Sequence, residues 1–597
     1  MMPASLDLAS LRAAYASDRF TPVQLIEALL PRLQACAPEI FIARVPDELL
    51  RARARELAAQ DPASLPLYGV PFAIKDNIDL AGLPTTAACE AFAYAPRDNA
   101  HVVQALLDAG AIAIGKTNLD QFATGLVGTR SPWGAVRNSF DPAYISGGSS
   151  SGSAAAVAQG LASFALGTDT AGSGRIPAAF NNLIGLKPSC GSLSTRGVVP
   201  ACQSLDCVSI FALTAEDAAW VLRHAGGVDP LDPWSRQPGT PAAIGWGERG
   251  PLRFGHAQAG QLDFLGNADY AALHKRACHQ LQSLGGAPVA VDIAPLLEAA
   301  RLLYDGPWIS ERYLAVEALL RSAPEALLPV TRQIIEAGAL PTATAAFRAQ
   351  YRLAALRRQA DALWQHIDVL LLPTAAIHWR IDEVQADPIG TNSALGRYTN
   401  FVNLLDMAAV AVPAGFTPQC LPFGVTLIGP SGSDADLLSL AGRLQRVVPA
   451  ATLGATGQPL PPAPACVADG RCIDVAVCGA HLSGLPLNGQ LTSRGARLRR
   501  STTTAPSYRL YALPGGPPQR PGLVRVAEGG VAIEVEVWSV PAQHLGSFID
   551  AIPAPLGIGR VRLADGSQVA GFVCEALGVV DAQDISSLGS WRRFVAG

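Results

Sequence analysis

The sequence predicts an α/β protein with a large, mostly buried sheet, followed by a smaller domain rich in β-strands. Short apolar runs alternate with helical patterns over about the first 450 residues, as in layered α/β folds. Proline and glycine then accumulate without periodicity at residues 454–470. Beyond this stretch, apolar and polar residues alternate with the two-residue period of half-exposed strands. We therefore expect domains at residues 1–455 and 471–597, joined by a Pro/Gly-rich linker at 456–470.

Helical and extended patterns follow one another in the first domain. Thr21 suits the N-cap and Pro22 the first turn of a helix with the sequence "VQLIEALLPRLQA". Short apolar and helical runs alternate in "LYGVPFAI", "HVVQALLDAG", "AIAIG", "LDQFATGL" and "AAVAQGLASFALG". Further on, "DVLLLPTAAI" predicts a buried strand and "DADLLSLAGRLQRVV" an amphipathic helix. In the second domain, "GGVAIEVEVWSVP" predicts a half-exposed strand.

Composition argues against nucleic acid and membranes as partners. The 597 residues carry a net charge of −4, which provides no basic surface for nucleic acid or anionic lipid. No apolar run reaches the ~18 residues that a membrane helix needs. Asp7, Arg12 and Asp18 interrupt the N-terminal segment where a secretory signal would need an apolar core. We therefore expect a soluble, cytoplasmic protein.

The cysteines predict free thiols and no metal site. Eleven are scattered along the chain, their number is odd, and no CxxC pair occurs. Cys202 and Cys207 lack a matching cluster of His or Cys for zinc, and so do the three cysteines between residues 465 and 480.

One nucleotide-binding pattern is rejected on its context. "GAIAIGKT", residues 110–117, matches the phosphate-loop pattern at every fixed position. Its four variable residues are Ala-Ile-Ala-Ile, however, which predict a strand instead of a phosphate-binding turn, and a helical pattern precedes them. We expect Lys116 to be a structural residue at the end of this strand.

A serine in a glycine-rich turn carries the candidate chemistry. Acyl transfer needs a nucleophile, a base and donors for the developing oxyanion. In "DTAGS", a tight turn would expose the hydroxyl of Ser173. The amides of Thr170, Ala171 and Gly172 would supply the donors.

The base is predicted to be a lysine. All nine histidines lie outside these motifs, which argues against a Ser-His-Asp triad. A lysine can accept a proton if burial lowers its pKa enough to keep it neutral. Lys75 ends the apolar run in "YGVPFAIKDNID" and is placed for such burial. A second serine could relay the proton between Lys75 and Ser173.

These stretches resemble the amidase signature family. The resemblance runs in order through "AIKDNID", "GKTNLDQFA", "SPWGAVRNSFDP", "SGGSSSGSAAAVA" and "LGTDTAGSGRIPAAFNNLIGLKPS". It implies the family's α/β fold, with a large mixed twisted sheet covered by helices, and a Ser-cisSer-Lys triad. Carried over, Lys75 is the base, Ser149 the cis serine and Ser173 the nucleophile, while Arg175 braces the loop. Without the resemblance, both serines would be interpreted as turn residues and Lys75 as a solvated lysine at a strand end.

Over essentially the whole chain, the pairing of this domain with its C-terminal tail resembles the allophanate hydrolase family. The resemblance implies that Tyr304 and Arg312, in "LLYDGPWISERYLAVEALL", bind the substrate, a small anion with an amide at one end and a carboxylate at the other. Paired hydrogen bonds from Arg312 would hold the carboxylate. Gly125 is expected to line the pocket, because a position without a side chain permits close approach.

The tail resembles a γ-glutamylcyclotransferase-like domain, a small α+β barrel. The resemblance implies that the first domain releases ammonia and N-carboxycarbamate from allophanate and that the tail assists decarboxylation, with His481 as the candidate residue. It implies no metal or organic cofactor, coupling to urea carboxylase, and a homodimer. Two alternatives stay open: another amidase, acting on aliphatic amides or biuret, and a tail that only binds or oligomerises.

Overall fold

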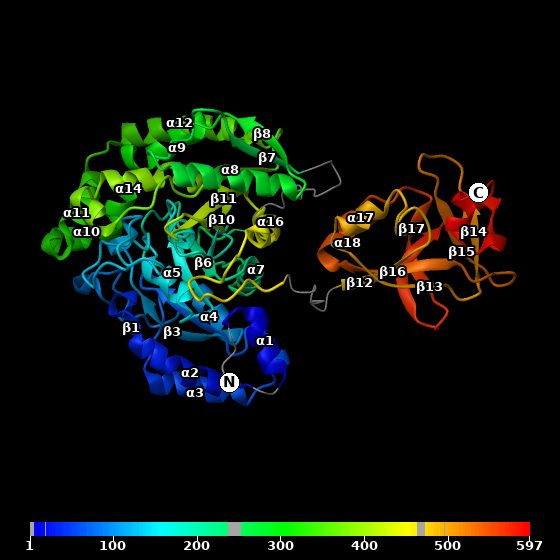
Figure 1. The fold of residues 1–597 in the computed structure, drawn as a ribbon, viewed down its shortest axis with the longest axis horizontal. Coiled ribbons are helices and arrows are strands. Elements are labelled where there is room, and N and C mark those ends of the chain that lie inside the picture. The colour runs from blue at the N-terminus through cyan, green and yellow to red at the C-terminus, as the bar shows by residue number, and fades with distance from the viewer. Residues whose placement is uncertain (1–4, 18–19, 237–251, 463–471, 495, 597) are drawn as a thin grey trace. The chain divides into compact units, whose positions relative to one another are not determined.

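The computed structural model describes residues 5–17, 20–236, 252–462, 472–494 and 496–596. They form two compact units (Figure 1). Each unit has a hydrophobic core of its own. The first unit contains a mixed sheet with 11 strands among these residues, and the second is small and rich in β-strands. The predicted fold class is confirmed.

The predicted linker at residues 456–470 lies partly outside the described residues, which exclude 463–471. Its described part, residues 456–462, packs with the first unit. The description of the second unit starts with β12 (Cys472–Val477).

The strands of the large sheet have the spatial order β1-β3-β2-β4-β6-β5-β10-β11-β9-β7-β8. β2 pairs in parallel with β3 and β4, whereas β4, β6, β5, β10 and β11 pair antiparallel in succession. Every residue of β2 to β6 is buried, which is typical of strands covered on both faces. The strand bounds are β1 (Phe41–Arg44), β2 (Pro71–Lys75), β3 (Ile112–Thr117), β4 (Phe164–Asp169), β5 (Ile184–Lys187), β6 (Cys207–Ala212), β7 (Arg253–Ala257), β8 (Ala287–Val291), β9 (Val369–Pro373), β10 (Met407–Phe416) and β11 (Pro422–Pro430).

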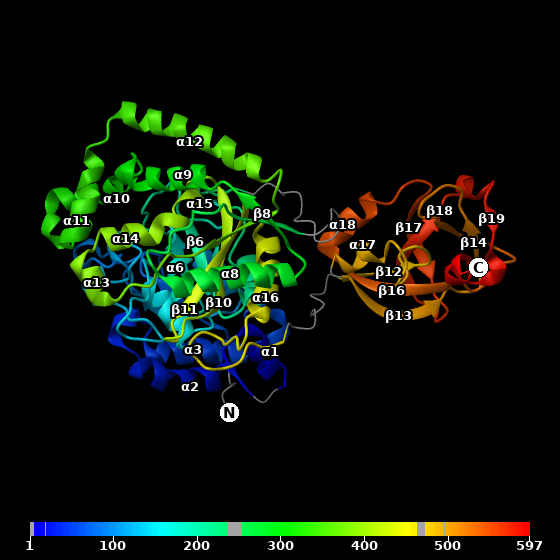
Figure 2. The ribbon, with the colours of Figure 1, turned by 45° about the horizontal axis from the view of Figure 1, so that its top comes forward.

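Helices pack along this sheet, and Figure 2 shows them around the central strands. α5 contacts β4, α7 contacts β6, and both α8 and α16 contact β10. The helix bounds are α1 (Leu8–Ala16), α2 (Pro22–Ala35), α3 (Asp47–Ala58), α4 (His101–Asp108), α5 (Ser151–Ala158), α6 (Ile176–Phe180), α7 (Ala215–His224), α8 (Ala268–Ser283), α9 (Ala294–Asp305), α10 (Ile309–Ser322), α11 (Pro329–Glu336), α12 (Ala343–Leu363), α13 (Ile381–Ala386), α14 (Gly390–Leu395), α15 (Phe401–Leu404) and α16 (Asp434–Val447).

Several local predictions are confirmed. Thr21 caps α2, accepting a hydrogen bond from the Gln24 amide while Gln24 accepts one from the Thr21 amide, and Pro22 opens the helix. The rejected phosphate-loop pattern contains β3, and its Lys116 is fully buried against Asp76 at 3.0 Å. The predicted buried strand and amphipathic helix are β9 and α16.

The segment "LDQFATGL" departs from the alternating helical and extended series predicted for this part of the chain. It contains only the short 3-10 turn η4 (Gln121–Ala123), in which Phe122 has the left-handed φ of 51°. The carboxylate of Asp120 accepts hydrogen bonds from backbone amides further along, those of Val127, Gly128 and Arg130. These bonds favour a loop, because a helix would satisfy the amides within its own backbone.

The second unit packs a five-stranded and a three-stranded sheet around one core. The spatial orders are β13-β16-β12-β18-β17 and β15-β14-β19 among the residues described. Its core includes Tyr508, Phe548, Phe572 and Trp591. The remaining bounds are β13 (Arg497–Thr503), β14 (Tyr508–Ala512), β15 (Pro521–Arg525), β16 (Glu534–Pro541), β17 (Leu556–Arg562), β18 (Gln568–Cys574), β19 (Gln583–Asp584), α17 (Asn488–Thr492), α18 (Ala542–Asp550) and α19 (Trp591–Val595).

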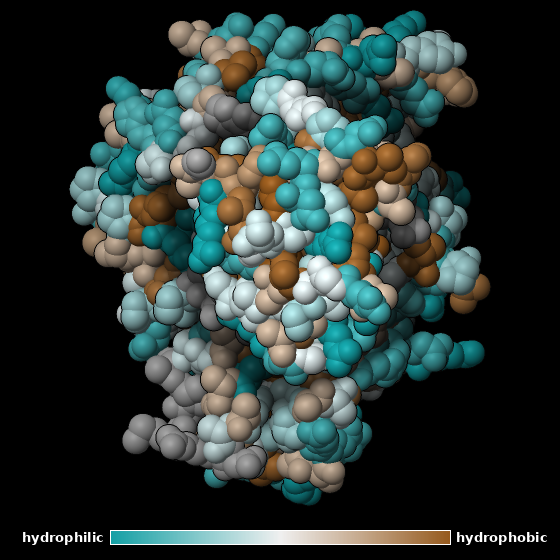
Figure 3. Space-filling view, turned by 90° about the vertical axis from the view of Figure 1, so that its right-hand side faces the viewer, coloured by the Kyte–Doolittle hydropathy of each residue, from teal (hydrophilic) through white to brown (hydrophobic). Residues whose placement is uncertain are grey.

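No helix among the described residues is both long enough and apolar enough to cross a membrane. On the face shown in Figure 3, hydrophobic residues are interspersed among hydrophilic ones.

Candidate active site

Lys75 lies at the carboxyl end of β2, beside the end of the parallel strand β4. Its side chain is fully buried. The Nζ donates to Ser149 Oγ at 2.7 Å and to Thr168 Oγ1 at 2.7 Å. The sheet thus brings together a buried amine and the serine predicted as its relay, although 74 positions separate them in the chain.

Burial lowers the pKa of Lys75 from 10.5 to about 7. Carboxylates of Asp120, Asp206 and Asp169 raise this pKa in part, and the charge of Arg312 lowers it. A large fraction of the amine is therefore neutral near pH 7, the state in which it can accept a proton.

Ser149 follows a cis peptide bond between Gly148 and Ser149. This segment lies tightly against Asp120: a Cβ at position 148 would be only 2.1 Å from Asp120 Oδ2. Only glycine fits at position 148 beside this carboxylate, and Asp120 in turn is fixed by the amides of its own loop.

Ser173 is held between two glycines that share one carboxylate. The Gly172 amide donates to Asp169 Oδ1 at 2.9 Å, and the Gly174 amide donates to Asp169 Oδ2 at 3.0 Å. Gly172 has a φ of 134°, and a Cβ there would lie 2.4 Å from Thr399 Oγ1. Asp169, the last residue of β4, therefore fixes the backbone on both sides of Ser173.

Arg175 braces this loop, as predicted. Both it and Asp169 are fully buried, and their side chains form paired hydrogen bonds of 2.9 Å. A third bond runs from Arg175 Nη1 to the Thr399 carbonyl at 3.1 Å. Burial raises the pKa of Asp169, but Arg175, Lys187 and the Gly174 amide together leave this pKa below its ordinary value.

The predicted oxyanion donors differ in their surroundings. The Gly172 amide is already engaged by Asp169, because the carboxylate needs donors in this buried site. The Thr170 hydroxyl donates to Asp206, a contact that involves its side chain and not its amide. The amides of Thr170 and Ala171 therefore stay the predicted donors.

Arg312 and Tyr304 lie together at the start of α10 and the end of α9. The Arg312 side chain is only 3% exposed, so it is no surface charge. Its Nη1 donates to the Ala123 carbonyl at 3.2 Å and to Thr124 Oγ1 at 3.1 Å. Its guanidinium carbon lies 5.6 Å from the centroid of the Tyr304 ring. Because its charge also acts on Lys75, Arg312 belongs to the electrostatic surroundings of this amine.

The absence of a side chain at Gly125 has a second explanation besides a place in the substrate pocket. A Cβ at this position would lie 2.6 Å from Asp120 Oδ2, so the missing side chain makes room for this carboxylate. Its place in a substrate pocket stays a prediction.

Three residues of this site were not singled out in the sequence. Thr168 contacts Lys75, Asp169 fixes the Ser173 loop, and the Asp120 amide donates to the Ser149 carbonyl at 3.0 Å. A signal for the two acidic residues was available: each stands between apolar and glycine-rich segments of the family motifs, and buried acidic residues nearly always bind partners.

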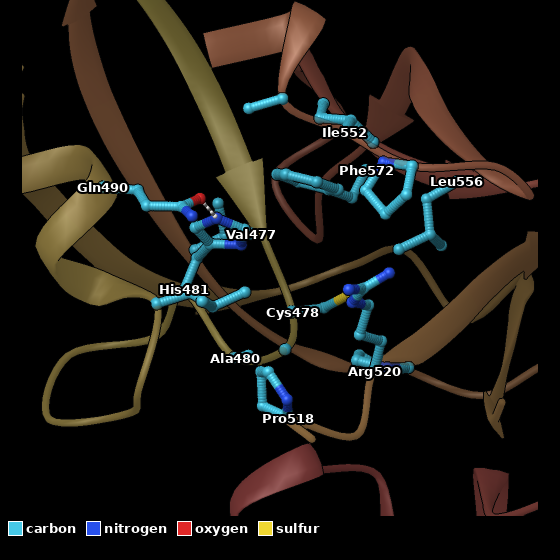
Figure 4. Close-up of a pocket in the computed structure, with 15 residues that line it drawn as sticks. Val477, Cys478, Ala480, His481, Gln490, Pro518, Arg520, Ile552, Leu556 and Phe572 are labelled. Atoms are coloured by element: carbon cyan, nitrogen blue, oxygen red, sulfur yellow. Dashed lines mark hydrogen bonds between the residues drawn. The ribbon is translucent and has the colours of Figure 1, made fainter. Parts of the chain in front are cut away.

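His481 lines a pocket of about 280 Å³ in the second unit. Figure 4 shows His481 and Gln490 joined by a hydrogen bond, with Arg520 and Phe572 around the same space. His481 Nε2 lies 2.9 Å from Gln490 Oε1, and the His481 ring stacks on Phe572. Burial lowers the pKa of His481, the bond with Gln490 raises it, and the charge of Arg520 lowers it, with a net decrease.

The site thus holds a buried lysine bonded to one serine, and a second predicted serine is held in a glycine-rich turn by Asp169. The family model named Amidase matches residues 24–438, and the chain belongs to this family. Within it, a more particular likeness holds over the whole length: the model of the allophanate hydrolase C-terminal domain matches residues 473–596. The solved structure of Kluyveromyces lactis allophanate hydrolase is 41% identical, with a TM-score of 0.85 and coverage of 98% of both chains.

Curated relatives include longer proteins. Urea amidolyase of Saccharomyces cerevisiae is 44% identical over 591 residues, which make up 96% of this chain and 32% of that protein. Urea amidolyase of Lachancea kluyveri is also 44% identical, over 89% of this chain and 30% of that protein. The chain thus spans about a third of the length of these two relatives.

Proposed function

We propose that this chain hydrolyses allophanate through Lys75, Ser149 and Ser173. The observation that carries the proposal is the fully buried Lys75 amine, 2.7 Å from Ser149 Oγ, in a chain similar from end to end to an allophanate hydrolase. The similarity to urea amidolyase also supports it.

In the proposed mechanism, neutral Lys75 takes a proton from Ser149, which takes one from Ser173. Ser173 Oγ then attacks the amide carbonyl, and the amides of Thr170 and Ala171 stabilise the oxyanion. The proton returns to the leaving nitrogen, and ammonia departs. Water, activated along the same relay, attacks the acyl-enzyme and releases N-carboxycarbamate.

Arg312 would fix the substrate through its carboxylate. Its buried guanidinium keeps a charge that two neutral acceptors, the Ala123 carbonyl and the Thr124 hydroxyl, do not neutralise. An anion of the right length would complete its hydrogen bonds, with Tyr304 beside it. Tyr304, Arg130 and Asn392 line a pocket of about 360 Å³, and we propose that the substrate enters through it.

The test is a comparison of substrates with a matched pair of variants. For Arg312→Ala, we expect kcat/KM on allophanate to fall about 10²- to 10³-fold, the loss of a buried charged hydrogen bond of about 3–4 kcal/mol. For the neutral amides acetamide and biuret, kcat/KM should fall far less in this variant. Arg321→Ala on the same helix removes an exposed arginine and serves as the control.

Equal losses on charged and neutral amides would contradict the carboxylate-binding role. Wild-type turnover of acetamide or biuret above that of allophanate would instead support the alternative of another amidase.

We further propose that the second unit assists decarboxylation of N-carboxycarbamate at the His481 pocket. Its neutral imidazole and the nearby charge of Arg520 could hold an anion while carbon dioxide leaves. For His481→Asn, we expect release of the first ammonia unchanged and decarboxylation at least about tenfold slower. Carbon-13 spectroscopy of the products distinguishes release of the first ammonia from decarboxylation. Ser173→Ala, which should block the release of the first ammonia, serves as the control for that step. Unchanged product release would favour a tail that only binds or oligomerises.

A homodimer is also proposed. Large apolar side chains are exposed along α10 to α12: Leu314, Leu340, Phe347 and Tyr351. Such side chains gather at interfaces between subunits. We expect Tyr351→Glu to shift the mass measured by light scattering from dimer to monomer, whereas Leu577→Glu, at an exposed position in the second unit, should leave it unchanged. A monomeric wild type would contradict the proposal.

Three further points complete the proposal. The domains are residues 1–455 and 471–597, the protein is located in the cytoplasm, and it works together with urea carboxylase. The coupling is supported by the similarity to a urea amidolyase of which this chain matches 32%. It predicts that urea carboxylase and this chain together release ammonia from urea, which neither does alone.

A further inference from the structure

Two thiols lie close to the clamp of Ser173, by which we mean the Asp169 carboxylate bonded to the Gly172 and Gly174 amides. These thiols take no part in the proposed mechanism. Cys207 Sγ donates to Cys190 Sγ at 3.4 Å. Lys187 Nζ lies 3.5 Å from the sulfur of Cys207 and 3.8 Å from that of Cys190. The three residues come from the end of β5, the loop after it and the start of β6.

The surroundings activate Cys190 as a thiolate. The hydrogen bond from Cys207 and the charge of Lys187 lower the pKa of Cys190, which burial raises, and the net result is a pKa of about 6. Asp406 raises this pKa slightly and Arg236 lowers it. Thiolates beside a lysine are the ones that react with oxidants.

The two cysteine residues differ in exposure. Cys190 is partly exposed, whereas Cys207 is only 2% exposed. A small oxidant would therefore meet the Cys190 thiolate first, with Cys207 in contact as the resolving thiol.

We propose that Cys190 and Cys207 form a disulfide when the protein meets a hydroperoxide, and that this bond reversibly inhibits the amidase. The Cys190 thiolate attacks one peroxide oxygen, the O–O bond breaks, and hydroxide leaves with the electron pair. Cys190 is then a sulfenic acid. Cys207 attacks its sulfur, the S–O bond breaks, and its hydroxyl leaves as water with the Cys207 proton. The two sulfurs are oxidised to the disulfide, and one hydrogen peroxide is reduced to one hydroxide and one water.

A disulfide between Cys190 and Cys207 would displace the nucleophile, Ser173, because Cys207 neighbours Asp169 in the clamp. Cys207 is the neighbour of Asp169 across the β4–β6 pair. Asn403 Nδ2 donates to the Asp169 carbonyl at 2.8 Å and lies 3.8 Å from Cys207 Sγ. Forming a disulfide of ~2.05 Å from a contact of 3.4 Å brings the two sulfurs closer together by about 1.35 Å in total. A displacement of about 1 Å in a catalytic group can lower the rate about 10²-fold.

The experiment treats the full chain with hydrogen peroxide and then with dithiothreitol. We expect peptide mapping to find Cys190 linked to Cys207, a fall in kcat of about 10- to 100-fold on whichever amide the enzyme turns over best, and recovery on reduction. Cys190→Ser and Cys190→Ala should resist inactivation. Cys420→Ser, which removes an exposed thiol elsewhere, should respond like the wild type.

Two results would overturn the proposal. One is mapping that shows no bond between these two cysteines after oxidation. The other is equal inactivation of the wild type and both Cys190 variants. Because the mapping does not depend on the substrate, it separates failure of this inference from failure of the proposed hydrolase activity.

Discussion

Replacing Lys75 by methionine is expected to lower kcat for amide hydrolysis about 10³- to 10⁴-fold, the contribution of a well-placed general base. Methionine fills a similar volume but cannot take the proton from Ser149. In the wild type, kcat/KM should rise about tenfold per pH unit up to the Lys75 pKa of about 7 and level off above it. Lys275→Met, at an exposed position on α8, serves as the control.

The same variant should be more stable than the wild type at low pH. Between pH 7 and 10.5 the unfolded chain keeps the Lys75 proton and the folded chain does not, so wild-type stability rises with pH there. Below pH 7 the full penalty of burying the ammonium is present. Lys75→Met avoids it, and we expect a gain of about 2–4 kcal/mol after the lost hydrogen bonds are deducted.

Urea unfolding at pH 6 and pH 10 measures this gain, which should shrink as the pH rises. A pH-independent difference, or a variant that keeps most of its activity, would exclude Lys75 as the base.

Patterns in the sequence predicted the elements of the fold better than the loops of the site. The fully buried strands β2 and β4 are short apolar runs, and α2 has its capping residues in place, so local composition determines them. The loop at η4 depends on Asp120, whose carboxylate binds amides up to ten positions away. Spacing alone does not show such bonds.

In the candidate site, too, some features could be predicted from the sequence and others depend on the folded loops. Lys75 and the two serines follow from motifs and chemistry, and the parallel pairing of β2 with β4 accounts for the meeting of Lys75 and Thr168. The engagement of the Gly172 amide was not predictable, because it depends on where the Asp169 carboxylate points. Only the folded chain decides which of several neighbouring amides a side chain binds.

That carboxylate carries the second large prediction: Asp169→Ala is expected to lower the free energy of unfolding by about 3–5 kcal/mol and to abolish measurable activity. The substitution leaves the fully buried Arg175 without its charged partner. It also leaves the amides of Gly172 and Gly174 without their acceptor, on both sides of Ser173. Urea unfolding monitors the first effect and ammonia release the second.

A double substitution separates the effect of the buried charge pair on stability from the effect of the Asp169 bonds to the Gly172 and Gly174 amides on activity. Asp169→Leu combined with Arg175→Met removes both buried charges, so its loss of stability should be smaller than the sum of the single losses. Activity should nevertheless stay lost, because the Gly172 and Gly174 amides still lack the carboxylate that positions Ser173. Glu298→Ala breaks the exposed bridge to Arg352 and should cost at most about 1 kcal/mol. If Asp169→Ala cost no more than this control, the buried pair would not hold the loop, and recovered activity in the double variant would show that Ser173 is positioned without the clamp.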